Sequence, residues 1–185
     1  MMKHKIAFLD DANLREFIDY LEKIPYSAYP KNIILDEKDL ASFRYYHGNR
    51  YIVAFDCSEK NNIIGHLCIM TPATKYGYHQ EHIVEVHINV IPEYQNKGIG
   101  KALLEFFIEE VKKGKKKSGI RKIKTKMLAG NEKVIRLFER FGFKKEALLK
   151  DEWKMIIESN RKSEDNCENN KKVIYEDGIY MSLIL

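Results

Sequence analysis

The sequence has few cysteines, and they lie far apart. Among its 185 residues it contains three, Cys57, Cys68 and Cys167, and no two of them form a C-x-x-C pair. An odd and scattered set argues against a disulfide framework and against a cysteine zinc site. A reactive cysteine is a minor alternative, because such a thiol needs a neighbour that lowers its pKa. We therefore expect neither disulfide bonds nor a bound metal.

Long apolar runs are also missing. No stretch approaches the roughly 18 residues that a membrane-spanning helix needs. The first residues, MMKHKIAFLDD, hold a short apolar stretch that two aspartates interrupt, and no small-residue cleavage site follows. This segment is typical of a first strand at residues 6–9. We expect no membrane partner and a location in the cytoplasm.

The composition favours one ordinary globular domain. Hydrophobic residues make up 44% of the chain and charged residues 32%, which excludes a disordered protein. There are no internal repeats. One polar stretch without periodicity, at about 158–173, interrupts the C-terminal part. We predict a single domain over residues 1–185, with this stretch as a long mobile loop.

The net charge is +5, and much of the excess lies in KKGKKKSGIRKIKTK, residues 112–126, which hold nine Lys or Arg and no acid. Such a patch could bind nucleic acid or a phosphorylated ligand. It lacks interleaved aromatic residues that would stack on bases. Cations also suit the C-terminal end of a helix. We favour a solvated helix end and do not expect nucleic acid as a partner, although this weaker alternative stays open.

Hydrophobic periodicity predicts a mixture of strands and helices. Apolar or alternating runs indicate strands at 6–9, 51–55, 63–70, 82–90, 120–128, 143–150 and 179–185. Spacings of three and four indicate helices at 11–24, 37–45, 98–113 and 131–142. The second and third strands are joined by a polar stretch and should form a hairpin. The pattern predicts a mixed α/β sheet with helices on its faces.

One stretch, VEVHINVIPEYQNKGIGKALLEFF at residues 84–107, joins a strand, a glycine turn and a helix start. Gly98 and Gly100 let the backbone approach a ligand closely, and the amides at a helix start suit a phosphate group. Lys97 and Lys101 add positive charge. A plain strand–turn–helix is the alternative, because two glycines alone are a weak motif.

Two blocks of the sequence resemble those of a known family. Gln95-x-x-Gly98-x-Gly100 resembles the Q/R-x-x-G-x-G/A signature of the GNAT acyltransferases, and NEKVIRLFERFGF at residues 131–143 resembles their second block. The closing YEDGIYMSLIL is similar to the final strand of members that act on small molecules and amino acids. The chain is thus identified as a member of this family. The resemblance implies a central mixed, mostly antiparallel sheet whose parallel strands splay apart, flanked by helices.

The resemblance also implies acetyl-CoA as cosubstrate, without a metal. Its pyrophosphate should lie on the amides of residues 96–101, and its pantetheine arm should pair with the backbone of Ile88 and Val90, like an added strand. Lys133 and Arg136 could reach the adenosine 3′-phosphate. The cofactor-binding residues implied in this way are Ile88, Val90, Gln95, Asn96, Lys97, Gly98, Ile99, Gly100, Lys101, Asn131 and Phe138.

Catalytic candidates lie on the strand before the glycine turn. Its alternation places Glu85, His87 and Asn89 on one face. Family members use a carboxylate or a histidine on this strand as the base that deprotonates the amine. We favour Glu85 and keep His87 in reserve; a half-solvated face without a catalytic role is the alternative. By the same resemblance, a backbone N–H near Val90 should stabilise the oxyanion.

The sequence departs from the family at Phe138, where many members have a tyrosine that protonates the leaving thiolate. Phenylalanine cannot donate a proton. Tyr94, Tyr180 or water could replace it, or the thiolate could leave unassisted, since a thiol pKa of about 8.5 permits this. A protein that binds acyl-CoA without catalysis is a further alternative.

The resemblance implies direct transfer of acetyl to a primary amine of a small molecule, an amino acid or a peptide N-terminus. The alternative is a non-catalytic regulatory module that binds acyl-CoA. The acceptor pocket should come from residues 25–48, the loop after residue 70 and the stretch at 158–173. Its candidate aromatic residues are Tyr26, Tyr29, Tyr45, Tyr46, Tyr76 and Tyr78. The acceptor stays open, and so does a homodimer.

Overall fold

The computed structural model describes residues 3–24, 50–58, 62–71, 80–158 and 171–185. The chain divides into two compact units, one of residues 1–125 with 183–185, the other of residues 126–182. The predicted helix at 37–45, the tyrosines proposed for the acceptor pocket and most of the polar stretch at 158–173 lie outside the described residues. No helix in the described ranges is long and apolar enough to span a membrane.

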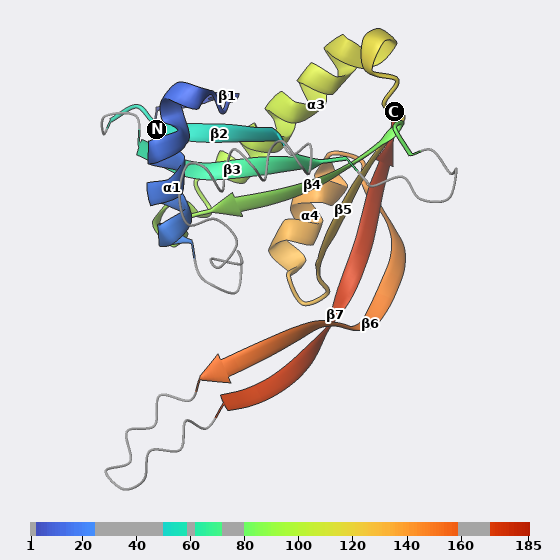
Figure 1. Ribbon diagram of the computed structural model, residues 1–185. Coiled ribbons are helices and arrows are strands. Elements are labelled where there is room, and N and C mark those ends of the chain that lie inside the picture. The colour runs from blue at the N-terminus through green and yellow to red at the C-terminus, as the bar shows by residue number, and fades with distance from the viewer. Residues whose placement is uncertain (1–2, 25–49, 59–61, 72–79, 159–170) are drawn as a thin grey trace, which may run out of the picture. The chain divides into compact units, whose positions relative to one another are not determined.

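The first unit is built on strands that neighbour one another in the order β1-β2-β3-β4-β5 (Figure 1). Their bounds are β1 (His4–Phe8), β2 (Arg50–Asp56), β3 (Asn62–Met70), β4 (Ile83–Val90) and β5 (Lys122–Leu128), the last of which ends in the second unit. The first four pair antiparallel, and β4 pairs parallel with β5. The predicted hairpin of β2 and β3 and the predicted strand before the glycine turn are confirmed.

The parallel pair is short. It joins Ile83 to Lys122, Val84 to Ile123 and Glu85 to Lys124, and the ladder ends there although β4 continues to Val90. The C-terminal half of β4 therefore lies beyond its pairing with β5.

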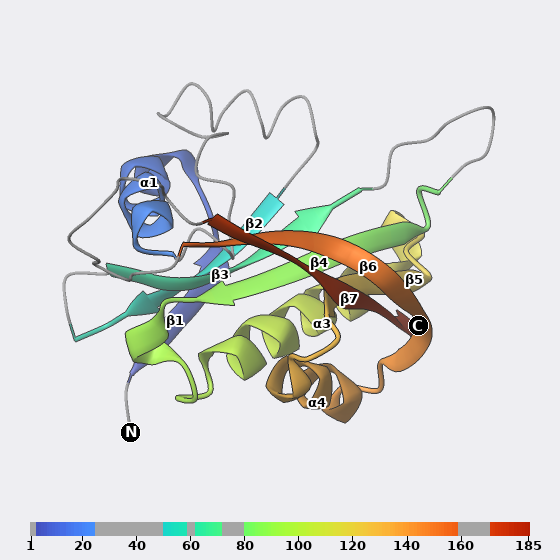
Figure 2. The ribbon, with the colours of Figure 1, turned by 90° about the horizontal axis from the view of Figure 1, so that it is seen from below.

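The helices of this unit that the structure describes lie on opposite faces of the sheet (Figure 2). They are α1 (Leu14–Lys23), which follows the 3₁₀ turn η1 (Asp11–Asn13), and α3 (Ile99–Ser118), which follows the 3₁₀ turn η2 (Pro92–Tyr94). Phe17 and Tyr20 of α1 pack their rings against His66 of β3. Gly65, the residue before His66, faces the opposite side of β3, where a Cβ would lie 3.2 Å from the side chain of Ile99 in α3. Because consecutive strand residues point to opposite faces, the two helices enclose the sheet.

The core of the first unit is the apolar lining between these layers. The buried residues of α3 recur at helical spacing and are Ile99, Leu103, Leu104, Phe107, Ile108 and Val111. The sequence pattern predicts an apolar stripe of Ile99, Leu103, Phe106, Phe107 and Val111, which is confirmed except at Phe106, which is half-buried. The helix also continues to Ser118, five residues past its predicted end, so the basic residues 112–117 form its last turns, where cations suit the helix dipole.

The second unit contains α4 (Glu132–Arg140) and a hairpin of β6 (Lys144–Glu158) and β7 (Lys171–Ile184) (Figure 1). Asn131 caps α4 by accepting a hydrogen bond from the Val134 amide at 3.4 Å, as predicted. Gly142 follows the helix with φ of 87°, a left-handed conformation that glycine adopts without strain. The sequence pattern predicts an apolar stripe of Val134, Leu137, Phe138 and Phe141 on this helix. This prediction is partly wrong, because Ile135 and Phe138 are its buried residues.

Both strands of the hairpin are longer than predicted. Glu158 and residues 171–173, which we assigned to the polar loop, belong to strands. The residues that the structure describes thus form seven strands, paired mostly antiparallel with one parallel pair, together with helices. The predicted mixed α/β fold class is confirmed.

Candidate active site

The free edge of β4 is the first part of the site. The Ile91 amide donates to the Ile64 carbonyl at 3.1 Å, and the register pairs Asn89 with His66 and His87 with Cys68. Antiparallel pairs alternate between bonded and non-bonded, so Asn89 and His87 turn their backbone groups toward β3. The intervening residues, Ile88 and Val90, turn theirs toward the opposite edge.

Within the described part of the chain, no further strand pairs with that opposite edge. It lies past the last β4–β5 pair, Glu85 with Lys124. The Val90 carbonyl accepts a hydrogen bond from Gln95 Nε2 at 3.0 Å, so Gln95 occupies one acceptor of the edge. The groups left to pair with an extended ligand are the N–H and C=O of Ile88 and the N–H of Val90. The pairing of the pantetheine arm with Ile88 and Val90 stays a prediction.

A loop with two left-handed residues follows the strand. Asn96 has φ of 60° and Gly98 has φ of 85°. The first hydrogen bond of α3 runs from the Ala102 amide to the Gly98 carbonyl at 3.0 Å, so the amides of residues 99–101 precede the helical ladder. The first turn contains no acidic residue. Amides grouped in this way at a helix start form an anion-binding concavity.

Gly98 combines this conformation with an open side. A side chain built at this position would meet no atom within 4 Å. Glycine is therefore required by the backbone conformation and not by crowding within the described part of the chain. The open space leaves room for a phosphate group next to the loop.

The Lys97 side chain packs against neighbouring protein groups. Its Nζ lies over the Tyr94 ring, 4.9 Å from the centroid. Its charge also acts on Asp56 of β2, whose pKa is held below its usual value first by the Ser58 hydroxyl and more weakly by Tyr94 and Lys97. The cation expected beside the phosphate is thus held by protein groups.

Glu85 and His87 meet on the face of the sheet that α1 covers. His87 Nε2 lies 3.1 Å from Glu85 Oε1, and their side chains are 31% and 18% exposed. An ionised carboxylate can only accept, so the imidazole N–H donates to it. The predicted shared face is confirmed, and the distance makes the two candidates one hydrogen-bonded pair.

A buried polar cluster next to this pair is absent from the sequence prediction. Tyr20 Oη donates to the Asn89 carbonyl at 3.1 Å and lies 3.0 Å from His66 Nδ1. The single phenol hydrogen is used on the carbonyl, so Nδ1 of His66 donates to Tyr20. Burial, and to a smaller extent the charge of His87, lowers the pKa of His66 to about 3. His66 is therefore a neutral histidine that orders the Asn89 backbone.

The tyrosine candidates for thiolate protonation differ in their surroundings. The Tyr94 hydroxyl donates to Asp56 Oδ2 at 2.9 Å and so is already committed. Tyr180 lies in the second unit, where Lys126 Nζ is 5.8 Å from the centroid of its ring. Roles for Tyr180 and for water in protonating the thiolate stay predictions.

The remaining predicted residues belong to the second unit. Asn131 uses its side-chain oxygen to cap α4. Phe138 is 1% exposed and packs edge-on against Phe143, with ring centroids 4.9 Å apart. Arg136 pairs with Glu132 at 3.1 Å. The roles proposed for Asn131, Phe138, Lys133 and Arg136 toward a ligand stay predictions.

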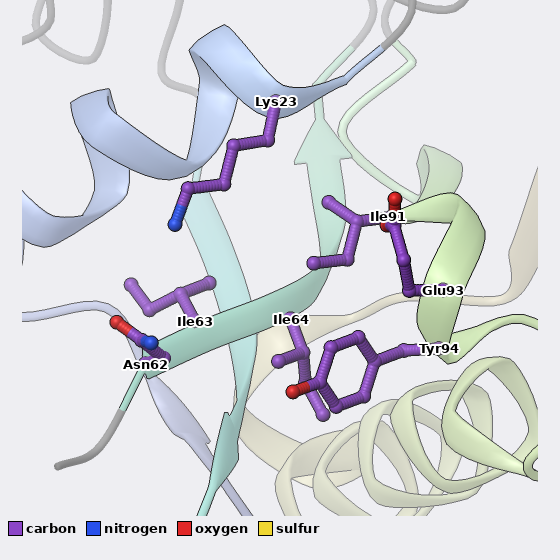
Figure 3. Close-up of a pocket in the computed structure, with 7 residues that line it drawn as sticks. All are labelled: Lys23, Asn62, Ile63, Ile64, Ile91, Glu93 and Tyr94. Atoms are coloured by element: carbon purple, nitrogen blue, oxygen red, sulfur yellow. The ribbon is translucent and has the colours of Figure 1, made fainter. Parts of the chain in front are cut away.

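A cavity of about 270 Å³ lies at the end of α1 and the start of β3 (Figure 3). Its lining residues are Lys23, Asn62, Ile63, Ile64, Ile91, Glu93 and Tyr94. None of the predicted cofactor-binding residues lines it. Within the described ranges, no group of three or more His, Cys, Asp or Glu side chains could hold a metal ion.

Comparison with protein families decides the assignment. The model of the acetyltransferase (GNAT) family matches residues 14–143. The chain belongs to this family. The match includes the strand, the loop and the helix start described above, and the predicted family is confirmed. A comparison with curated proteins finds no match.

Solved structures of acetyltransferases share the GNAT fold with this chain. Phosphinothricin acetyltransferase of Sinorhizobium meliloti, in complex with acetyl-CoA, has 22% identity, covers 100% of this chain and 89% of its own, and gives a TM-score of 0.69. The ribosomal-protein-S18-alanine N-acetyltransferase of Escherichia coli has 20% identity with coverages of 98% and 94% and a TM-score of 0.65. A GNAT acetyltransferase of Streptococcus pneumoniae has 18% identity with coverages of 99% and 100% and a TM-score of 0.73. At these identities the likeness shows the fold.

Proposed function

We propose that the protein is an N-acetyltransferase that moves acetyl from acetyl-CoA directly to a primary amine of a small molecule, an amino acid or a peptide N-terminus. The observation that carries the proposal is the free edge of β4 running into a loop whose helix-start amides form an anion site. The structural neighbours that are named as acting on an amino acid residue or on phosphinothricin support a small amine acceptor.

The binding half of the proposal follows from backbone groups. The amides of residues 96–101, with Lys101 beside them, receive the pyrophosphate of acetyl-CoA. The N–H and C=O of Ile88 pair with the pantetheine arm as a neighbouring strand would. Because backbone groups supply these bonds, register and spacing matter more than side-chain identity along β4.

The chemical half assigns roles to the Glu85–His87 pair and to Val90. Glu85 accepts a proton from the acceptor ammonium, directly or through one water, while His87 holds the carboxylate by its hydrogen bond. The amine nitrogen then attacks the thioester carbonyl, the C–N bond forms and the C–S bond breaks. The Val90 N–H stabilises the oxyanion at that step. The nitrogen, which carries a positive charge after the attack, releases its second proton to water, and the thiolate leaves with the C–S electron pair and takes a proton from water.

The rest of the proposal rests on the sequence. The chain acts as one acetyltransferase domain in the cytoplasm, with its amine acceptor as the partner, and a homodimer stays open. The competing proposal is a regulatory module that binds acyl-CoA without turnover. The observation in its favour is Phe138, which stands where many family members carry the proton-donating tyrosine.

Release of the CoA thiol from acetyl-CoA across a panel of amino acids, polyamines, aminoglycosides and short peptides tests the function. We expect release with one class of amine. Glu85→Gln should lower turnover with that amine by about 100-fold, because a positioned general base contributes that much. Glu105→Gln, at an exposed site on α3, is the matched control and should not change turnover.

Two outcomes would contradict the proposal. Acetyl-CoA binding by calorimetry without thiol release from any amine would favour the regulatory module. Full activity of Glu85→Gln would remove the assigned base while leaving the enzyme assignment in place.

A further inference from the structure

We propose that Asp56 and Tyr94 form a positioning pair that fixes the anion-binding loop and thereby sets the affinity for the phosphate-bearing half of acetyl-CoA. The inference rests on the proposed function, because it deepens the role of the loop in binding that cosubstrate. It assigns a role to two residues that are not among the cofactor-binding residues predicted from the sequence.

Asp56 is a fixed carboxylate at the end of β2. Its side chain is buried, with 2% of the residue exposed. Oδ1 accepts hydrogen bonds from the Ser58 amide at 2.9 Å and the Ser58 hydroxyl at 2.6 Å. Oδ2 accepts from the Tyr94 hydroxyl at 2.9 Å. Both oxygens are therefore occupied, and hydrogen bonds to a charged group are stronger than those between neutral groups.

Tyr94 transmits this anchor to the loop. It is the last residue of η2, directly before Gln95 and the left-handed Asn96. Gln95 provides a second anchor through its bond to the Val90 carbonyl. A non-glycine residue in the left-handed region persists where its surroundings hold it. Both anchors hold the chain directly before Asn96, where the amides begin to converge.

The same pair controls the placement of Lys97. Its ammonium lies over the Tyr94 ring, and the Asp56 carboxylate lies close enough for the two charges to interact. A cation held on an aromatic face and near a carboxylate has less freedom than a solvated lysine. Loss of the Tyr94 hydroxyl would remove the hydrogen bond that holds the ring at Asp56. The Lys97 ammonium, which lies over that ring, would then no longer be held in place.

A packing role for Tyr94 makes a different prediction. Its ring lines the cavity beside Ile64 and Ile91 (Figure 3), and that contact depends on the ring alone. Tyr94→Phe keeps the ring and removes the hydrogen bond to Asp56. The variant therefore separates positioning through the hydroxyl from filling of space by the ring.

The test compares two ligands that share the thioester and the arm. Acetyl-CoA carries the phosphates, whereas S-acetylpantetheine does not. Calorimetry gives the Kd of acetyl-CoA, and displacement of acetyl-CoA gives that of the weaker S-acetylpantetheine. We expect Tyr94→Phe to raise the Kd of acetyl-CoA about tenfold and to leave that of S-acetylpantetheine unchanged. Ser58→Ala, which loosens Asp56 without touching the loop, should raise the same Kd by a smaller factor.

The controls separate the possible failures. Tyr175→Phe removes a hydroxyl from a residue that is 58% exposed in the second unit, and it should change neither Kd. If the unaltered protein fails to bind acetyl-CoA, the proposed function is wrong. If it binds and Tyr94→Phe binds equally well, the positioning pair is wrong. An equal rise in both Kd values would show general disruption and would also overturn the inference.

Discussion

At the scale of single residues, the sheet face that carries Glu85 also holds a buried histidine, His66, which is an unusual setting for an imidazole. His66 is 1% exposed and is enclosed by the rings of Phe17, Tyr20 and Tyr51. It contributes an ordered hydrogen bond to Tyr20, and Tyr20 in turn holds the Asn89 carbonyl. Proton uptake by His66 would place a charge in this apolar setting, which is why burial lowers its pKa so far.

This histidine predicts a pH dependence of stability. Its pKa is about 3 in the folded protein, against 6.5 for an unperturbed histidine. Between these values the unfolded chain binds a proton that the folded chain does not, so stability falls as the pH falls below 6.5. We expect a loss of about 2 kcal/mol between about pH 7 and about pH 5 from this group, measured by urea unfolding.

The variant His66→Gln isolates that contribution. It should be less stable at neutral pH but should lose less stability on acidification than the unaltered protein. His82→Gln, at an exposed site, should keep the original pH dependence. An unchanged pH dependence in His66→Gln would show that other groups control acid stability.

Residue-level prediction from the sequence succeeded where a pattern carried the information. Alternation along β4 placed Glu85 and His87 on one face, and the structure confirms it. The alternation does not predict the hydrogen bond between the two side chains, which is 3.1 Å long. His66 was missed because it lies within an apolar run and carries no motif, and Tyr20 because it falls outside the predicted stripe of α1. Asp56 pairs with Tyr94 across 38 positions, which local patterns do not reveal.

At the scale of elements, the start of α3 is seated on the sheet at Gly65. A Cβ at this position would meet the Asn89 carbonyl oxygen at 3.1 Å and the side chains of Ile99 and Val90 at 3.2 Å. The backbone neighbour cannot give way as a flexible side chain could. Glycine thus permits the first turn of α3, with its anion-binding amides, to approach β3 and β4 closely.

We therefore predict that Gly65→Ala lowers the free energy of unfolding by about 1–3 kcal/mol, as overpacking does in other cores. Gly114→Ala is the matched control. Gly114 lies within α3, and a Cβ there would meet no atom within 4 Å in the described part of the chain. It should raise stability by about 1 kcal/mol through helix propensity. Urea unfolding of both variants measures the difference. A Gly65→Ala protein as stable as the control would show that the contact relaxes freely.

Element boundaries were predicted less well than element types, and β6 shows why. The prediction ended this strand at residue 150, where the polar run Lys-Asp-Glu begins. The structure instead has an irregularity, with Asp151 at φ of 50° and a register shift between Leu149 and Trp153. Asp177 holds it by accepting from the Asp151 amide at 3.1 Å and from Lys150 Nζ at 2.6 Å. A bulge fixed by a distant residue has the sequence appearance of a strand end.

At the scale of the whole molecule, charge and family point to the same class of ligand. The net charge of +5 favours association with an anionic cosubstrate such as acetyl-CoA, although it does not identify one. The two sequence blocks were sufficient to predict the family because they occur in register. The acceptor could not be predicted in the same way, because the segments proposed for its pocket carry no motif.

The surface proposed to bind acetyl-CoA lies within one unit. The edge at Ile88 and Val90 and the loop at residues 95–101 all belong to the first unit. They can be tested together without knowing the acceptor amine. The measurement is therefore a titration of acetyl-CoA followed by the backbone amide signals of the protein in solution.

Amide chemical shifts on titration with acetyl-CoA test whether the cosubstrate binds at the edge of β4 and at residues 96–101. We predict saturable shifts at Ile88, Val90 and residues 96–101, because these amides would bond the arm and the pyrophosphate. The amides of Asn89 and His87, which face β3, should respond less. An absence of shifts at residues 96–101 when the ligand is in excess would contradict the account, and so would saturable shifts confined to other parts of the chain.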